Sequence, residues 1–265
     1  MHLRHSLCAL LAFAAALPTF APLRAAEDFK TMFEKHEFAG SGEGTPLRYR
    51  LMRPTAVEEG KKYPLVLFLH GAGERGSDNE AQLKWGMADF ATEEARNKYP
   101  AYVLAPQCPT GEKWSNVDWS ARESSLPEKA SDSMGLTLQV IEKMLKEEPI
   151  DPARIYITGL SMGGYGTWDA LARRPELWAA AIPICGGGDP ATVERFKAIP
   201  IWCFHGDADT AVRVERSRQM IEALKKAGVE PKYTEYPGVG HNSWSATYAN
   251  PEVHAWLFAQ RRAAE

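Results

Sequence analysis

The stretch "IYITGLSMGGYGTW", residues 155–168, runs from a β-favouring segment into a serine that is surrounded by glycines. Gly159 and Gly163 stand two residues on either side of Ser161, and they leave room for the chain to pass closely while it turns. Such a turn exposes the serine hydroxyl where a strand meets a helix, beside the free N–H groups of that helix. The stretch therefore predicts a nucleophilic serine on a strand-to-helix turn.

The segments on both sides of this turn alternate between strand-like and helix-like patterns. The run 63–71 is continuously apolar, as expected of a strand covered on both faces, whereas 47–54 alternates like an exposed antiparallel edge strand. Further strands are expected at 101–107, 154–159, 179–187, 199–206 and 232–238, and amphipathic helices at 133–148, 213–228 and 250–262. This alternation predicts one α/β domain with a mostly parallel sheet and helices on both faces.

A nucleophilic serine needs a base and an acid, and two loops of this chain supply candidates. The segments "CFHGDADTAV" (203–212) and "YPGVGHNSW" (236–244) each follow a strand, so they lie at the same sheet edge as the serine. His241 is the predicted general base. Asp209 is the predicted acid, because it begins the turn into the next helix, where a carboxylate can reach a histidine and accept backbone N–H groups. Asp207 is the alternative acid, and otherwise it braces the loop.

A third loop, "LHGAGERG" (69–76), leaves the first parallel strand on two glycines, so its backbone N–H groups can point toward the serine. The predicted oxyanion donors are the N–H groups of Met162, which follows the nucleophile, and of Ala72. This loop lacks the G-K-[ST] ending of a phosphate-binding loop. The segment "HGDAD" has no second histidine at helical spacing, which argues against a metal hydrolase. No metal and no cofactor are therefore expected.

These motifs resemble those of the α/β-hydrolase superfamily, and more narrowly those of the small bacterial phospholipase/carboxylesterase-type esterases. Dienelactone hydrolases and the catalytic domains of prolyl oligopeptidases are relatives of this group. The resemblance runs through nearly the whole chain after residue 25, in the segments "FLHGAGERGSDN", "LAPQCP", "ITGLSMGGYGTW", "FHGDADTAV" and "GVGHNSW".

The resemblance implies the α/β-hydrolase fold and a serine hydrolase that cleaves carboxylic esters through an acyl-enzyme. It implies Ser161 as nucleophile, Asp209 as acid and His241 as base, with backbone donors at Ala72 and Met162. The H-G-x-x-D pattern of the family is present as "HGDAD" and independently selects Asp209. The alternative is a serine peptidase like prolyl oligopeptidase, although the sequence shows no segment for the propeller that those enzymes use.

The surroundings of the predicted site are the guide to its substrate. Where related enzymes carry a cap, this chain has only the short stretch 185–199, so no cap domain is expected. An uncovered cleft suits short acyl chains on small molecules, or esters attached to a polysaccharide. Four tryptophans are candidate walls of that cleft, although they also fit a role in covering the sheet: Trp85, Trp114, Trp119 and Trp244.

The first 25 residues have the pattern of a secretory signal peptide. A basic start is followed by an apolar run at 7–17 and by small residues before a polar segment. Cleavage is expected after Ala25, with Ala26 as the alternative. This leaves a catalytic domain over 26–265, exported to the periplasm or the medium. A stable membrane anchor is not expected, because the apolar run is short and prolines follow it.

The composition of the chain argues against some classes of binding partner. It has 265 residues, 45% of them hydrophobic, with 34 acidic and 31 basic residues. The signal segment holds two of the basic residues and no acid, so 29 basic residues remain against 34 acidic ones. This balance argues against nucleic acid or an anionic membrane as a partner. Cys108, Cys185 and Cys203 allow one disulfide in an exported protein, but sequence selects neither the pair nor an oligomeric state.

Overall fold

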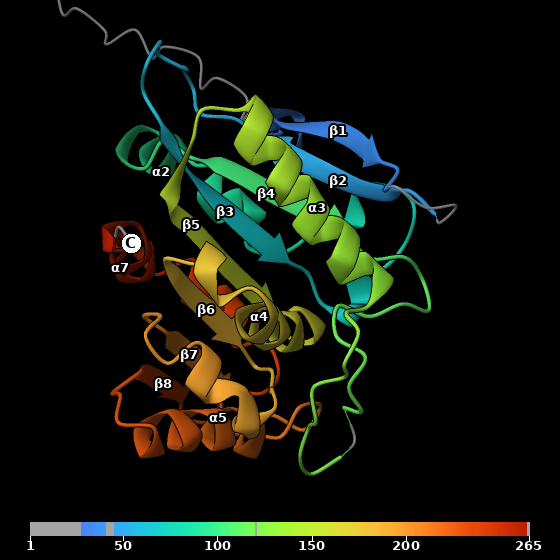
Figure 1. The fold of residues 1–265 in the computed structure, drawn as a ribbon, viewed down its shortest axis with the longest axis vertical. Coiled ribbons are helices and arrows are strands. Elements are labelled where there is room, and N and C mark those ends of the chain that lie inside the picture. The colour runs from blue at the N-terminus through green and yellow to red at the C-terminus, as the bar shows by residue number, and fades with distance from the viewer. Residues whose placement is uncertain (1–27, 41–44, 120, 264–265) are drawn as a thin grey trace, which may run out of the picture.

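The computed structural model describes residues 28–40, 45–119 and 121–263. The predicted signal peptide and its cleavage site therefore lie outside the described residues. Figure 1 shows a central sheet with helices packed on both of its faces. Eight strands form this sheet in the order β1-β2-β4-β3-β5-β6-β7-β8.

Six neighbouring strands of the sheet are parallel. In chain order they are β3 (Tyr63–Leu69), β4 (Tyr102–Gln107), β5 (Ile150–Leu160), β6 (Ala180–Ile184), β7 (Trp202–Gly206) and β8 (Lys232–Tyr236). All seven residues of β3 are buried, because helices cover this strand on both faces, as its continuous apolar sequence predicts. The predicted mostly parallel α/β fold is confirmed.

The first two strands, β1 (Phe33–Phe38) and β2 (Leu47–Met52), are antiparallel to each other, and β2 is also antiparallel to β4. The prediction that 47–54 forms an edge strand was wrong, because β1 pairs with its outer side and leaves most of β2 buried. The edge is β1 instead. Three charged residues of β1 are exposed, which protects this open edge from pairing with another chain.

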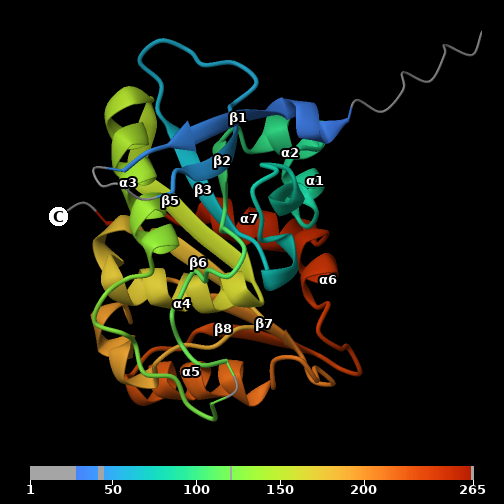
Figure 2. The same cartoon turned by 90° about the vertical axis from the view of Figure 1, so that its right-hand side faces the viewer.

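Two sets of helices cover the two faces of the sheet (Figures 1 and 2). One face carries α3 (Asp132–Glu147), α4 (Met162–Arg173) and α5 (Glu215–Lys226), and the other carries α1 (Met87–Phe90), α2 (Glu93–Lys98), α6 (Trp244–Tyr248) and α7 (Pro251–Ala259). Short 3₁₀ helices lie between these elements: η1 (Phe29–Met32), η2 (Ala72–Glu74), η3 (Ala81–Leu83), η4 (Pro175–Leu177) and η5 (Pro190–Arg195). Apolar side chains fill a large hydrophobic layer on each face.

The three helices predicted from amphipathic patterns are present as α3, α5 and α7. The last of them begins at the expected cap, where the Asn250 side chain accepts the N–H of Glu252 at 2.9 Å. It ends at Ala259, before the predicted end at residue 262. No continuous apolar run or helical period marks β1, α1, α2 and α6, which have at most six residues each, so these elements were not predicted.

The register of the parallel strands brings several loops to one edge of the sheet. Leu69 of β3 pairs with Gly159 of β5, and Gly206 of β7 pairs with Tyr236 of β8. Loops that follow these strands therefore leave the sheet side by side. Between β6 and β7 the chain forms only η5, so the described residues place no cap domain over this edge, as predicted.

No helix in the described part of the chain combines the length and the apolar composition needed to cross a membrane. The three cysteines within the described ranges, Cys108, Cys185 and Cys203, are all buried and free. The disulfide that the sequence allowed between two of them is therefore not formed.

Candidate active site

Ser161 occupies the turn between β5 and α4 in a strained backbone conformation, with φ at 53° and ψ at −116°. Its N–H donates to the carbonyl of Ile184 on β6 at 3.0 Å, which holds the turn against the sheet. A Cβ on Gly159 would meet the backbone of Gly163, and a Cβ on Gly163 would meet the carbonyl oxygen of Leu69. Only glycine fits at these two positions, because chain segments pass so closely there.

The structure brings Ser161, His241 and Asp209 together from three loops. The Oγ of Ser161 lies 2.9 Å from Nε2 of His241, and Nδ1 of His241 lies 2.7 Å from Oδ2 of Asp209. A carboxylate can only accept a hydrogen bond, so Nδ1 carries the ring hydrogen and Nε2 accepts from the serine hydroxyl. This is the tautomer that a general base for Ser161 requires.

Asp209 is buried, and both of its carboxylate oxygens are hydrogen-bonded. Oδ1 accepts the N–H groups of Ala211 and Val212 at 2.8 and 2.9 Å, while Oδ2 accepts from His241 and from His205. Burial by itself would raise the pKa of this carboxyl, but hydrogen bonds from the two histidines and from Val212 hold the pKa well below its ordinary value. Asp209 is therefore a carboxylate throughout the ordinary working range of pH.

Asp207, the alternative acid of the sequence analysis, has a different partner. Its Oδ1 accepts the N–H of Gly238 at 2.6 Å, so it connects the loop after β7 to the loop after β8. The contact with His241 is made by Asp209. The structure therefore places Asp209 against His241, and Asp207 in the position that braces the loop.

The two predicted oxyanion donors lie at the first positions of neighbouring helices. Met162 begins α4 and Ala72 begins η2, so neither N–H has a carbonyl partner within its own helix. Gly71 brings the second of these helices close to Ser161, since a Cβ there would lie 3.6 Å from Cβ of that serine. Both helices begin next to the serine, with N–H groups that can bind a negatively charged oxygen.

His70 supports the η2 loop from inside the protein. Its Nε2 accepts the N–H of Cys108 at 2.9 Å, and its Nδ1 lies 2.7 Å from the carbonyl oxygen of Gly71, so Nδ1 carries the hydrogen. Burial lowers the pKa of His70 to about 4, and the ring is therefore uncharged at neutral pH. This histidine fixes the loop and does not contact Ser161.

Three of the four candidate tryptophans lie around the catalytic loops. The ring of Trp244 meets that of His241 edge-on, with 5.2 Å between centroids, and Trp85 lies 6.0 Å from Trp244. Trp119 is half-buried and packs on Tyr165 of α4 at 6.3 Å. Trp85 and Trp244 together form an aromatic wall beside the histidine, in which Trp85 is half-buried and Trp244 is buried in the core.

The prediction that Trp114 lines the cleft was wrong. Its side chain is fully buried beneath Gly166 of α4 and packs edge-on against His70. Its Nε1–H donates to the carbonyl of His70 at 3.0 Å, so it anchors the loop from below. The sequence pattern is the same for a tryptophan that lines a site and for one that is buried under its loop. The two are distinguished only by their burial in the structure.

Three buried polar residues near the site were not among the predicted site residues: Glu74, His205 and Ser217. Oε1 of Glu74 accepts Nε1–H of Trp85 at 3.2 Å, which connects η2 to the aromatic wall. His205 contacts Oδ2 of Asp209, the same oxygen that His241 contacts. The one signal for His205 was its place at the start of the H-G-x-x-D pattern, and no pattern marked Glu74 or Ser217.

One group of possible metal ligands coincides with this site. Donor atoms of Cys185, Asp209 and His241 lie within 4.8 Å of one another. Burial raises the pKa of the Cys185 thiol far above its ordinary value, so this residue is not a thiolate. Both ring nitrogens of His241 already have hydrogen-bond partners. Asp209 and His241 are engaged in the hydrogen-bonded chain with Ser161, and Cys185 offers no thiolate, so the three residues do not fit a metal centre.

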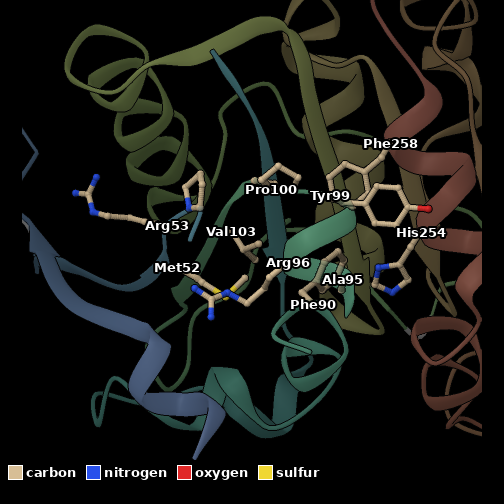
Figure 3. Close-up of a pocket in the computed structure, with 12 residues that line it drawn as sticks. Met52, Arg53, Phe90, Ala95, Arg96, Tyr99, Pro100, Val103, His254 and Phe258 are labelled. Carbon is tan, nitrogen blue, oxygen red and sulfur yellow. The ribbon is translucent and has the colours of Figure 1, made fainter. Parts of the chain in front are cut away.

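Figure 3 shows a small cavity elsewhere in the molecule, lined by residues of β4, α2 and α7. Its volume of about 10 Å³ is enough for about one water molecule. Met52, Phe90, Tyr99 and His254 are among its walls, and none of the predicted site residues is. This cavity is a gap in packing, too small for an organic substrate.

A family model described as phospholipase/carboxylesterase matches residues 54–250 of the chain. The matched range contains Ser161, Asp209 and His241, together with both predicted oxyanion donors.

A solved structure described as a thermostable esterase superimposes with a TM-score of 0.82 at 45% identity, over 88% of this chain and 64% of that one. A probable carboxylesterase SOBER1-like protein of Arabidopsis thaliana is 27% identical over 192 residues, which are 67% of this chain and 72% of that protein. An uncharacterized secreted protein of Arthroderma benhamiae is 29% identical over 244 residues, which are 75% of this chain and 24% of that protein. The chain thus spans under two thirds of the solved esterase and about a quarter of the fungal protein.

Proposed function

Because the chain belongs to the phospholipase/carboxylesterase family, we propose that it is an exported carboxylesterase with Ser161, His241 and Asp209 as its catalytic triad. The observation that carries this proposal is the 2.9 Å contact between Ser161 Oγ and His241 Nε2, with Asp209 2.7 Å behind the ring. Nucleophile, base and acid are hydrogen-bonded in the order that acyl transfer to serine needs.

The first half of the reaction forms an acyl-enzyme. Ser161 Oγ attacks the ester carbonyl carbon while Nε2 of His241 takes the hydroxyl proton. The carbonyl oxygen becomes an oxyanion, which the N–H groups of Met162 and Ala72 bind. The tetrahedral intermediate collapses, the C–O bond to the alcohol breaks, and Nε2–H returns its proton to the departing alkoxide. Asp209 holds Nδ1–H throughout and stabilises the charged imidazole.

The second half regenerates the serine. A water molecule gives one proton to Nε2 of His241 and attacks the acyl carbon, so a second oxyanion forms at the same two N–H groups. The bond from Ser161 Oγ to the acyl carbon then breaks, and Oγ takes the proton back from Nε2. The free acid leaves, and the site returns to its starting state.

The proposed substrates are short-chain esters of small molecules and acyl esters attached to a polysaccharide. No cap domain stands over the site in the described residues, and the side chain of His241 is 27% exposed. An open site of this kind can receive an ester that projects from a polymer. Trp85, which is half-buried and packs on Trp244, supplies an aromatic surface near the base, where a sugar or phenolic ring can stack.

We place this enzyme outside the cytoplasm, in the periplasm or the medium. Residues 1–25 act as the signal peptide in this proposal, and 26–265 form a single catalytic domain. The basic start, the apolar run at 7–17 and the small residues after it support export. The similarity to a protein described as secreted agrees with it.

A panel of substrates tests the proposed activity. The purified protein and its Ser161→Ala variant are assayed on p-nitrophenyl acetate, butyrate and palmitate, on methyl ferulate and on a peptide anilide. We expect turnover of the short esters that is lost in the variant, and little turnover of palmitate. Turnover of the anilide without the esters would replace the proposal with a peptidase, and ester turnover that survives in the variant would reject Ser161 as nucleophile.

A further inference from the structure

A second histidine contacts the acid of the proposed triad, at the same carboxylate oxygen as His241. His205 is the fourth residue of β7 and is fully buried. Its Nε2 lies 3.1 Å from Oδ2 of Asp209 and 2.8 Å from the carbonyl oxygen of Val212. Its Nδ1 lies 2.7 Å from Oγ of Ser217, in the first turn of α5. Both ring nitrogens therefore have partners within the protein.

The partners of Nε2 determine which atom of His205 carries a hydrogen. A carbonyl oxygen and a carboxylate oxygen can only accept, so Nε2 must be an N–H donor shared between Val212 and Asp209. Ser217 holds the other side of the ring, and its hydroxyl lies 3.1 Å from the carbonyl oxygen of Gly186 as well. The orientation of His205 is thus fixed from two directions.

We propose that His205 is a positioning residue of the triad, whose Nε2–H holds Oδ2 of Asp209 in place and moderates its pull on the Nδ1–H of His241. This inference rests on the proposed function. Two N–H donors meet on the one oxygen Oδ2, and each withdraws part of its negative charge. The backbone N–H groups on Oδ1 keep the carboxylate in position when one of these donors is lost.

Removal of the Nε2–H donor of His205 should move the pH–rate profile in one predictable direction. Without Nε2–H of His205, Oδ2 carries more negative charge and binds a protonated His241 more tightly. His241 then stays charged to a higher pH, so the acid limb of the pH–rate profile moves upward. A residue that only filled space would lower the rate or the stability without moving this limb.

The other titratable groups packed around His205 and Asp209 keep a constant charge near neutral pH. Burial raises the pKa of Cys203 on β7 to about 12, and burial also raises the pKa values of Cys185 after β6 and of Tyr165 on α4, so all three are neutral. Glu235 on β8 is the register partner of His205 on β7. A hydrogen bond from Arg218 on α5 lowers the pKa of Glu235, which is therefore charged and paired.

Two substitutions of His205 test the proposal: both introduce a side-chain amide, and they differ in side-chain length. In His205→Gln, the side-chain N–H₂ group can take the place of Nε2, whereas in His205→Asn it reaches only the position of Nδ1. We expect kcat for p-nitrophenyl butyrate to fall about ten- to hundredfold in His205→Asn, with KM nearly unchanged. The acid limb of kcat/KM should rise by roughly half a pH unit or more. His205→Gln should keep the limb in place and recover most of kcat.

A third variant covers the case in which His205→Asn does not fold. Ser217→Ala leaves His205 in place but removes the partner of its Nδ1, so we expect a smaller upward movement of the same limb. Equal profiles for the Asn and Gln variants, or an unmoved limb in all three variants, would overturn the proposal. Failure of the proposed function itself would look different, because the unaltered protein would then show no ester turnover that depends on Ser161.

Discussion

The hydroxyl of Ser161 lies 2.9 Å from Nε2 of His241, although 80 positions separate the two residues in the sequence. The contact forms because β5 and β8 end at the same edge of one sheet, so the loops that follow them meet. The hydrogen bond also assigns the ring hydrogen of His241 to Nδ1, where Asp209 accepts it. This relationship makes several consequences measurable.

Activity should depend on pH through the histidine alone on the acid side. His241 must be uncharged to accept the serine proton, so kcat/KM should fall on the acid side, where the ring takes up a proton of its own. Asp209 should add no second limb there, because its pKa is held well below the ordinary value. A profile of kcat/KM from pH 4 to 9 checks this, and a flat profile across that range would rule out His241 as the base.

Substitution of each of the two aspartates in the "HGDAD" segment should have a sharply different effect on kcat. Asp209→Asn removes the acceptor that keeps the hydrogen on Nδ1 of His241, so kcat should fall about 10³- to 10⁴-fold. Asp207→Asn is the matched control, since it alters only the contact with the N–H of Gly238 and should leave kcat close to that of the unaltered protein. Equal losses in the two variants would contradict the assignment of the acid.

The closely packed turn predicts a large loss of stability in Gly163→Ala. The new Cβ would meet the backbone carbonyl of Leu69, so the end of β3 or the start of α4 must move, at a cost of about 3 kcal/mol or more. Gly135→Ala in α3 is the control, because no atom beyond the neighbouring residues and backbone of its own helix lies within 4 Å of its Cβ position, and alanine favours a helix by about 0.5–1 kcal/mol. Urea unfolding of both variants measures the difference, and similar midpoints would contradict it.

The tryptophans should separate into a structural and a substrate-facing group. Trp114→Ala should lower the free energy of unfolding by about 3–5 kcal/mol, because the side chain is fully buried and hydrogen-bonded to the loop. Trp85→Ala should instead raise KM for methyl ferulate roughly two- to tenfold, with a smaller loss of stability. An unchanged KM in Trp85→Ala would show that this residue only covers the sheet.

The site was predictable from sequence because its signals are local. A continuous apolar strand such as β3 and a glycine-flanked serine can each be recognised within about ten residues, and a parallel sheet brings the loops after its strands to one edge. That topology alone predicts that Ser161, Asp209 and His241 meet.

The features that were not predictable from sequence depend on contacts between distant segments of the chain. The role of β1 as the edge strand depends on its pairing with β2. A segment of six residues of mixed polarity has no pattern that predicts such pairing. The burial of Trp114 depends on α4 lying over it. The contact of His205 with Ser217 depends on how α5 sits against β7. No local pattern encodes these relationships.

Covalent labelling tests the nucleophile most directly. The purified protein is treated with a fluorophosphonate at pH 8, and the modified residue is located by mass spectrometry of its peptides, beside Ser161→Ala and His241→Ala. We expect one adduct, on Ser161, no adduct in Ser161→Ala, and much slower labelling in His241→Ala. Absence of an adduct from the unaltered protein, or an adduct on another residue, would contradict the proposed triad.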